Sequence, residues 1–190
     1  MIKQLKKRFF SALRYTKESR NYIYIIISLF IISGIFGYLN HSNLTELDNI
    51  IKGLLESTKD LSGPSLIGFI FLNNIQSAFY GLIFGVILGI FPIINALING
   101  VLIGYVIEKA VSSVGILQTL RLLPHGIFEL PAIFISLGLG LRLGLFVFTK
   151  NKTKELKKSF FEGLNAFFLI VLPLLIIAAI IEGTLIALIK

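Results

Sequence analysis

The sequence predicts an all-α membrane protein: a bundle of five transmembrane helices, with a re-entrant or broken segment before or within the fourth. Of its 190 residues, 55% are hydrophobic and only 15% are charged, and the mean hydropathy is +0.88. A soluble domain has about 25% charged residues. The apolar blocks leave no room for a separate soluble domain, so residues 1–190 form a single membrane-embedded domain.

Basic residues account for the net charge of +8 and gather next to two of the apolar blocks. Clusters of Lys and Arg beside membrane segments are typical of cytoplasmic loops and attract anionic lipid. They therefore indicate membrane topology rather than nucleic-acid binding. The first cluster comprises Lys3, Lys6, Lys7, Arg8, Arg14, Lys17 and Arg20, and the second comprises Lys150, Lys152, Lys154, Lys157 and Lys158.

The first part of the chain gives three predicted spans. Residues 22–39 form an apolar helix about as long as the bilayer core is thick. The polar stretch that follows contains an amphipathic segment over residues 44–60, which we expect to lie on the outer surface. The next apolar block would be about 63 Å long as one helix, twice the bilayer core, so it must fold back. Pro92 is the expected break, which gives spans at 66–90 and 93–108.

The remaining chain gives a fourth span at 129–148 and a fifth at 160–188. With the N-terminus inside, the chain emerges outside after the third span, and the lysines at 150–158 must be inside. A single crossing between them leaves surplus residues, enough for a half-helix or a re-entrant segment. Pro124 and Pro131 bracket the place where regular helix should fail. The C-terminus is then outside.

Small residues recur at four-residue spacing in three of the predicted helices. Membrane helices associate through close packing, and small side chains let their backbones approach each other. The series predict a tight bundle around the second, third and fourth helices, and they are compatible with a homodimer. Packing is preferred to ligand binding as their role. The series are Gly81, Gly85 and Gly89; Gly100 and Gly104; and Ser136, Gly140 and Gly144.

An ionisable cluster lies within an otherwise apolar stretch near the fourth predicted span. Arg121, His125 and Glu129 recur every four residues, so on a continuous helix they would share one face. Ionisable groups at membrane depth cost roughly 2.5–3.5 kcal/mol each, so such a group indicates a functional site. The segment that contains the last two reads Pro124-His125-Gly126-Ile127-Phe128-Glu129-Leu130-Pro131.

Three interpretations of this cluster are open. The cluster and neighbouring polar side chains can satisfy one another by hydrogen bonds and so fix the helix positions. Alternatively, His125 and Glu129 form a ligand or proton site. In the third interpretation they are candidate metal ligands of a hydrolase, because zinc-binding helices place their ligands at this spacing. No cofactor is required by the sequence. The polar partners expected from the second and third helices are Asn73, Asn74, Gln76, Asn95 and Asn99.

Several of these motifs together resemble the stage II sporulation protein M family. The resemblance covers essentially the whole chain and implies a five-span inner-membrane protein. It also implies a scaffold rather than an enzyme. In endospore-forming bacteria this scaffold helps recruit cell-wall-degrading partners during engulfment. The resemblance implies no catalytic residue. The matching residues are Phe71-Leu72-Asn73-Asn74, Asn99-Gly100 with Gly104, Leu123-Pro124-His125-Gly126, and Glu129-Leu130-Pro131-Ala132 followed by Gly138 and Gly140.

We therefore expect a non-enzymatic scaffold or subunit of a complex in the cell (cytoplasmic) membrane, with a buried polar site around His125 and Glu129. A transport or channel-like component is the alternative, because broken helices with polar groups often form binding sites at mid-membrane. A metal-dependent intramembrane hydrolase is the second alternative. The expected partners are the lipid bilayer, other membrane proteins and a second copy of the chain; nucleic acid is not expected.

Overall fold

The computed structural model describes residues 2–61, 63–119 and 126–189, and it is helical throughout, with no strand in those ranges. Within them, five helical segments are long and apolar enough to cross a membrane, which confirms the predicted number of spans. In the same ranges, three shorter α-helices lie outside the spans: α1 (Ile2–Glu18), α3 (Leu47–Lys59) and α6 (Ile116–Thr119). The spans are Arg20–Leu39, Pro64–Val86, Ile90–Val114, Gly126–Phe148 and Lys152–Ile181.

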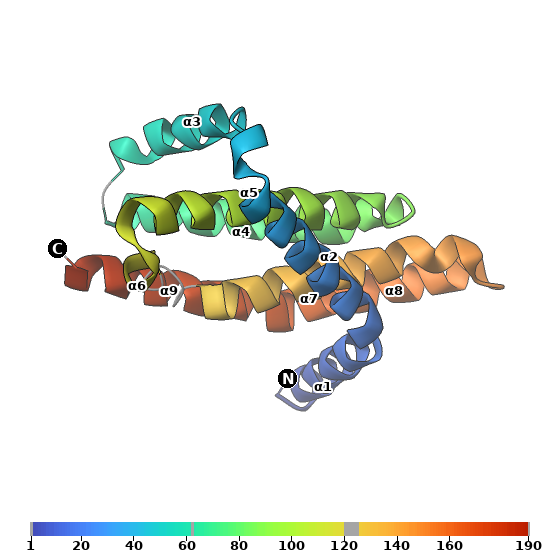
Figure 1. Cartoon of the computed structure of the whole chain (residues 1–190). Helices are drawn as coiled ribbons and strands as arrows, with labels where there is room; N and C mark the ends of the chain where they lie inside the picture. Colours follow the sequence, from blue (N-terminus) through green and yellow to red (C-terminus); the bar gives the residue numbers. More distant parts are fainter. Residues whose placement is uncertain (1, 62, 120–125, 190) are drawn as a thin grey trace.

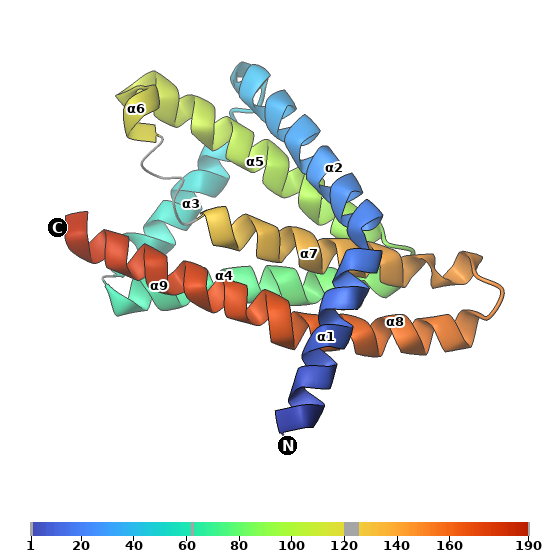
Figure 2. The ribbon, with the colours of Figure 1, turned by 90° about the horizontal axis from the view of Figure 1, so that it is seen from below.

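The fourth span is the centre of the bundle. Its main helix, α7 (Gly126–Gly144), contacts α4 (Pro64–Ile83), α5 (Ile90–Val114), α2 (Arg20–Leu39) and the last span. In Figure 2 it runs between α2 and α5 on one side and the last span on the other. Half of the residues in the most apolar stretch of this span are buried, whereas only 17% are buried in the corresponding stretch of α2. Therefore α7 forms the core of the bundle, whereas α2 turns most of its surface outward.

The second and third spans are joined by a tight reversal. Helix α4 continues into the short 3-10 helix η2 (Phe84–Val86), and α5 begins at Ile90. The turn uses left-handed backbone at Leu88 (φ 54°) and Gly89 (φ 70°), and glycine adopts this conformation at little cost. Pro92, the expected break, instead lies buried in the first turn of α5, where the missing N–H has no helical partner to lose.

Glycines bring two pairs of helices into backbone contact. A Cβ atom added to Gly85 would overlap the backbone of Gly140, which joins the end of the second span to α7. A Cβ atom added to Gly104 would overlap the backbone of Gly34, which joins α5 to α2. Thus the second span pairs with the fourth, and the third pairs with the first.

The last two spans form a helical hairpin. Helix α7 runs through Pro131 without a break and ends in the 3-10 helix η4 (Leu145–Phe148). After a turn, α8 (Lys152–Ala166) starts well before the predicted boundary at residue 160, and a π-helical turn, η5 (Phe167–Val171), links it to α9 (Leu172–Ile189). The π turn ends two residues before Pro173, whose ring disfavours regular α-helix. A re-entrant segment would involve residues 120–125, which lie outside the described residues, so it stays a prediction.

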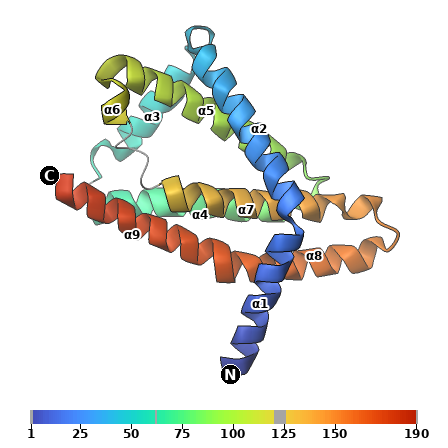
Figure 3. The ribbon, with the colours of Figure 1, turned by 60° about the horizontal axis from the view of Figure 1, so that its bottom comes forward.

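The two ends of the bundle carry different short helices. Helix α1 bends away from α2 at Ser19 and crosses α8 (Figures 2 and 3). At the opposite end, the 3-10 helix η1 (His41–Asn43) leads into α3, which in Figure 1 starts beside the end of α2 and lies above α4 and α5. We refer to these as the α1 end and the α3 end. The α4–α5 reversal and the α7–α8 turn lie at the α1 end.

Candidate functional site

A small polar cavity lies between α4, α5 and α7. Its polar lining comes from Asn73 and Asn74 on α4, Asn95 and Asn99 on α5, and Glu129 on α7. The cavity has a volume of about 60 Å³. A water needs roughly 10–15 Å³ of such space, so the cavity has room for a few waters. The rest of its lining is mostly apolar: Phe30, Ser77, Ala96, Ile103, Leu130, Ile133 and Leu137.

The side chains of α4 and α5 hydrogen-bond across this cavity. Asn95 Nδ2 donates to Ser77 Oγ at 3.2 Å, which links α5 to α4. Asn99 Nδ2 donates to the backbone carbonyl of Asn95 at 2.9 Å and to its Oδ1 atom at 3.0 Å. Hydrogen bonds of this kind between membrane helices contribute on average about 0.6 kcal/mol each. The network therefore orients the two helices more than it stabilises them.

Glu129 contributes the acidic group of the cavity. It lies in the first turn of α7, where the helix dipole favours a negative charge, and its side chain is half-buried. Together with Asn74 it also lines a second, smaller space against Leu175, Ala178 and Ala179 of α9. The carboxyl group thus faces the junction of α4, α7 and α9.

The other ionisable members of the predicted cluster, Arg121 and His125, lie outside the described residues together with Pro124. Their proximity to Glu129 stays a prediction, and so does the proton or metal site that depends on it. Within the described ranges, no three His, Asp or Glu side chains gather closely enough to hold a metal ion. Gln76 is not part of the cavity lining; it lies on an exposed face of α4 beside Phe79 and Tyr80.

The α3 end holds a charge network that sequence reasoning did not find. Tyr105 donates a hydrogen bond to Asp48 Oδ1 at 2.7 Å, and Lys109 Nζ lies 3.7 Å from Asp48 Oδ2. The hydrogen bond from Tyr105 is the main reason that the pKa of the Asp48 carboxyl is lowered, and the charge of Lys109 adds to the effect. Beside it, His41 Nε2 lies 3.6 Å from Glu108 Oε1, which also accepts a hydrogen bond of 2.6 Å from Ser112.

At the α1 end, the Arg142 guanidinium is held by contacts with Ser19 and with the last turn of α1. Arg142 Nη1 donates to Ser19 Oγ at 2.8 Å, and Nη2 lies 3.7 Å from Glu18 Oε2. The guanidinium also lies over the ring of Tyr15, 4.2 Å from its centroid. The Arg142 side chain therefore fixes the junction of α1 and α2 to α7.

The α7–α8 turn extends past the α4–α5 reversal at the α1 end (Figures 2 and 3). Its tip, residues 145–158, carries the second lysine cluster, and all five lysines are exposed. Phe148 at the tip is 78% exposed. Sequence reasoning treated this segment as a short loop, because it started the last span at residue 160. Because α8 starts at Lys152, this segment is part of a helical hairpin that projects from the bundle rather than a short loop.

Comparison with known proteins places the whole bundle in one family. A family model described as stage II sporulation protein M matches residues 25–185, which include all but the start of the first span and all of the later ones. No curated protein and no solved structure shows a significant match to the chain.

Proposed function

Because the chain belongs to the stage II sporulation protein M family, we propose that it is a non-enzymatic scaffold or subunit of a complex in the cell membrane. The observation that carries this proposal is the projecting tip of the α7–α8 hairpin. It combines five exposed lysines with an exposed Phe148, and it is held on the most buried helix of the bundle. A basic surface with an aromatic anchor suits an acidic segment of a partner protein.

The orientation that fits this role has the α1 end in the cytoplasm. Both basic clusters lie at that end, and the positive-inside rule assigns such clusters to the cytoplasmic side. The N-terminus is then inside and the C-terminus outside, and α3 lies on the outer surface. The partner that binds the hairpin tip is accordingly a cytoplasmic protein or the cytoplasmic part of a membrane protein.

The asparagine-lined cavity has a structural role in this proposal. Asn99 donates to Asn95, Asn95 donates to Ser77, and the volume of the cavity accommodates only a few waters. Glu129, with the predicted contributions of His125 and Arg121, completes a polar network that fixes α4, α5 and α7 relative to each other. Close glycine packing along α4–α7 and α2–α5 holds the same helices together.

Photo-crosslinking in living cells tests the scaffold proposal. A photoreactive amino acid replaces Phe148 in one variant and, as a matched control, Ile98 in another; Ile98 is 61% exposed and lies within α5, away from both of its ends. We expect the Phe148 position to form an adduct with one discrete protein, and the Ile98 position to form none. The double variant Lys152→Gln/Lys154→Gln should weaken the adduct several-fold. Only lipid adducts or free chain at both positions would contradict the proposal.

A transport or channel-like function is the second candidate, and the position of the cavity favours it. Asn73 and Asn99 lie near the middle of their spans, where carriers often bind their substrates, and they share the cavity with Glu129. Proteoliposomes that contain the purified chain test this function with proton and alkali-cation gradients. Flux that falls at least tenfold in Glu129→Gln or Asn99→Leu would establish it. Flux equal to that of empty vesicles would contradict a transport function and leave the cavity with only its structural role.

A further inference from the structure

Helix α1 has an apolar face that no other part of the described chain covers. Leu5, Phe9 and Leu13 follow one another at four-residue spacing, so they share a helix face, and they are 58%, 41% and 41% exposed. The opposite face carries most of the first lysine and arginine cluster. A short helix with one apolar and one basic face lies in the plane of a membrane surface, with its apolar face among the acyl chains.

Contacts with the last span fix the depth at which α1 meets the membrane. The Ser11 hydroxyl donates one bifurcated hydrogen bond to the two carboxylate oxygens of Glu162, at 3.2 and 3.1 Å, and Asn165 Nδ2 donates to the Arg8 carbonyl at 2.9 Å. Glu162 and Asn165 lie just beyond the lysine-rich start of α8, where the apolar part of the last span begins. Helix α1 therefore lies at the level of the lipid headgroups.

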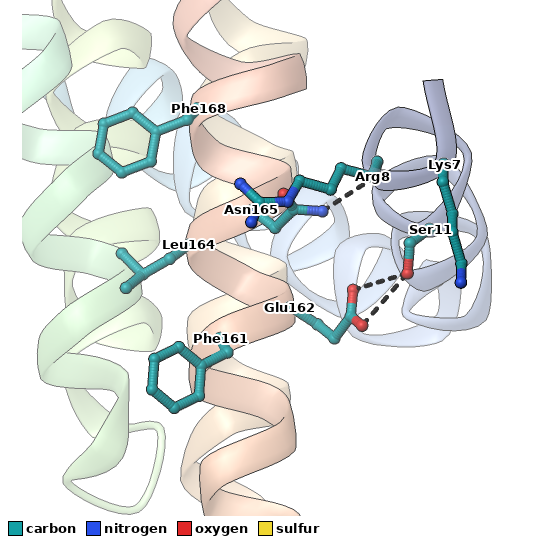
Figure 4. A pocket seen from close by; sticks show the side chains of 8 residues that line it. All are labelled: Lys7, Arg8, Ser11, Phe161, Glu162, Leu164, Asn165 and Phe168. Carbon is teal, nitrogen blue, oxygen red and sulfur yellow. Dashed lines mark hydrogen bonds between the residues drawn. The ribbon is translucent and has the colours of Figure 1, made fainter. Parts of the chain in front are cut away.

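A cavity of about 460 Å³ opens between the two helices at this level. Lys7 and Arg8 lie on its α1 side, while Phe161 and Phe168 point from the last span away from α1 (Figure 4). Both cationic side chains are exposed and form no ion pair with the described residues. Phe161 and Phe168 are 67% and 54% exposed, and they lie about 10 Å apart along the helix axis. The cavity therefore has a basic end and an apolar wall directed into the bilayer.

We propose that this cavity binds the headgroup of one anionic phospholipid. The phosphate lies between Lys7 and Arg8, and an acyl chain runs along Phe161 and Phe168 toward the bilayer centre. The Glu162 carboxylate is turned toward Ser11 and accepts a hydrogen bond from its hydroxyl, which keeps the acidic charge on the α8 side of the cavity. The charge of α1, six cations against Glu18, selects anionic over zwitterionic lipid. This binding does not depend on the scaffold function.

Tryptophan fluorescence tests the proposal, because the chain contains no tryptophan. Phe168→Trp places the only indole at the apolar wall of the cavity, and Phe84→Trp, in a separate variant, places it at the same end of the bundle, away from α1. The full-length protein is reconstituted in phosphatidylcholine vesicles with increasing fractions of brominated phosphatidylglycerol or brominated phosphatidylcholine. We expect brominated phosphatidylglycerol to quench the indole at position 168 with about fivefold higher relative affinity or more, the factor expected from one cation near the surface. The indole at position 84 should show no preference.

Two double variants of equal charge, each made in the Phe168→Trp protein, locate the binding. Lys7→Gln/Arg8→Gln removes the two cations of the cavity, and the preference for phosphatidylglycerol should fall to about one. Lys3→Gln/Arg14→Gln removes two other cations of α1 that do not line it, and the preference should persist. Equal loss in both variants would show diffuse surface attraction and overturn the proposal. The absence of any preference in the Phe168→Trp protein with all its cations in place would also overturn it.

Discussion

The two ends of the bundle differ in how their charges are satisfied. At the α3 end, charged groups pair within the chain: Asp48 contacts Tyr105 and Lys109, and His41 lies beside Glu108. At the α1 end, Arg142 is anchored inside the protein, but the lysines of α1 and of the hairpin tip are exposed. The α3 end also exposes charges of both signs, such as Lys52 and Glu56, whereas the α1 end offers an excess of exposed positive charge to lipids and partners. We therefore expect the binding functions of the molecule at the α1 end.

The largest expected difference between the two ends is their accessibility to a membrane-impermeant reagent, because such a reagent labels a cysteine on the outer side of the membrane and leaves one on the inner side unlabelled. The chain has no cysteine, so single-cysteine variants need no further change. We expect Asn49→Cys on α3 to react with a membrane-impermeant maleimide in intact cells. Asn151→Cys in the hairpin should react only after lysis. The reverse pattern would place the hairpin outside and contradict the cytoplasmic binding proposed for it.

Substitution of a closely packed glycine at the α1 end should lower the unfolding temperature by several degrees, whereas substitution of a glycine at the α3 end should not. At the α1 end, Gly85→Val would force side-chain atoms into the backbone of Gly140. Overpacking of this kind costs about 3 kcal/mol, or roughly 6–12 °C in the unfolding temperature of a chain this size. At the α3 end, a Cβ atom on Gly53 meets nothing within 4 Å, so Gly53→Ala in α3 is the matched control. Thermal unfolding in detergent measures both, and equal losses would disprove tight packing at Gly85.

Removal of the Arg142 side chain should have a smaller effect. Arg142→Ala deletes the hydrogen bond to Ser19 and the contact with the Tyr15 ring, at a cost of about 2 kcal/mol. Arg142→Lys keeps the charge but loses the planar fork, so it should recover only part of that loss. We further expect protease cleavage within α1 to accelerate in Arg142→Ala. Unchanged cleavage would show that Arg142 does not hold α1 in place.

The smallest expected effect is a pH dependence at the α3 end. The pKa of Asp48 is lowered in the folded protein, so its interaction with Tyr105 and Lys109 stabilises the fold above the ordinary aspartate pKa of about 3.9. This contribution disappears as the pH falls through the folded-state pKa. The unfolding temperature of Asp48→Asn should therefore lie below that of the unchanged protein at pH 7 and approach it near pH 3. A difference that is the same at both pH values would contradict this account.

The number of spans was predictable from sequence because hydropathy and the bilayer thickness determine it. The position of the reversal was not, since Pro92 fits the first turn of a helix and the turn depends on left-handed backbone at Leu88 and Gly89. Asn73, Asn74 and Asn99 were identified as partners by their polarity, and they share a cavity with Glu129. The crossing of α1 over α8 depends on contacts between residues 151 apart, such as Ser11 and Glu162, which no local pattern encodes.

The contacts that hold α1 against α7 and α8 have a consequence for the order of membrane insertion. Helix α1 is synthesised well before the two residues that anchor it, Arg142 and Glu162. During insertion the helix can associate only with lipid, and it reaches its final place once the last hairpin has entered the membrane. Docking of α1 thus follows synthesis of the last hairpin, and a truncated chain that lacks the fifth span would lose the Ser11–Glu162 anchor but keep the contacts of Arg142.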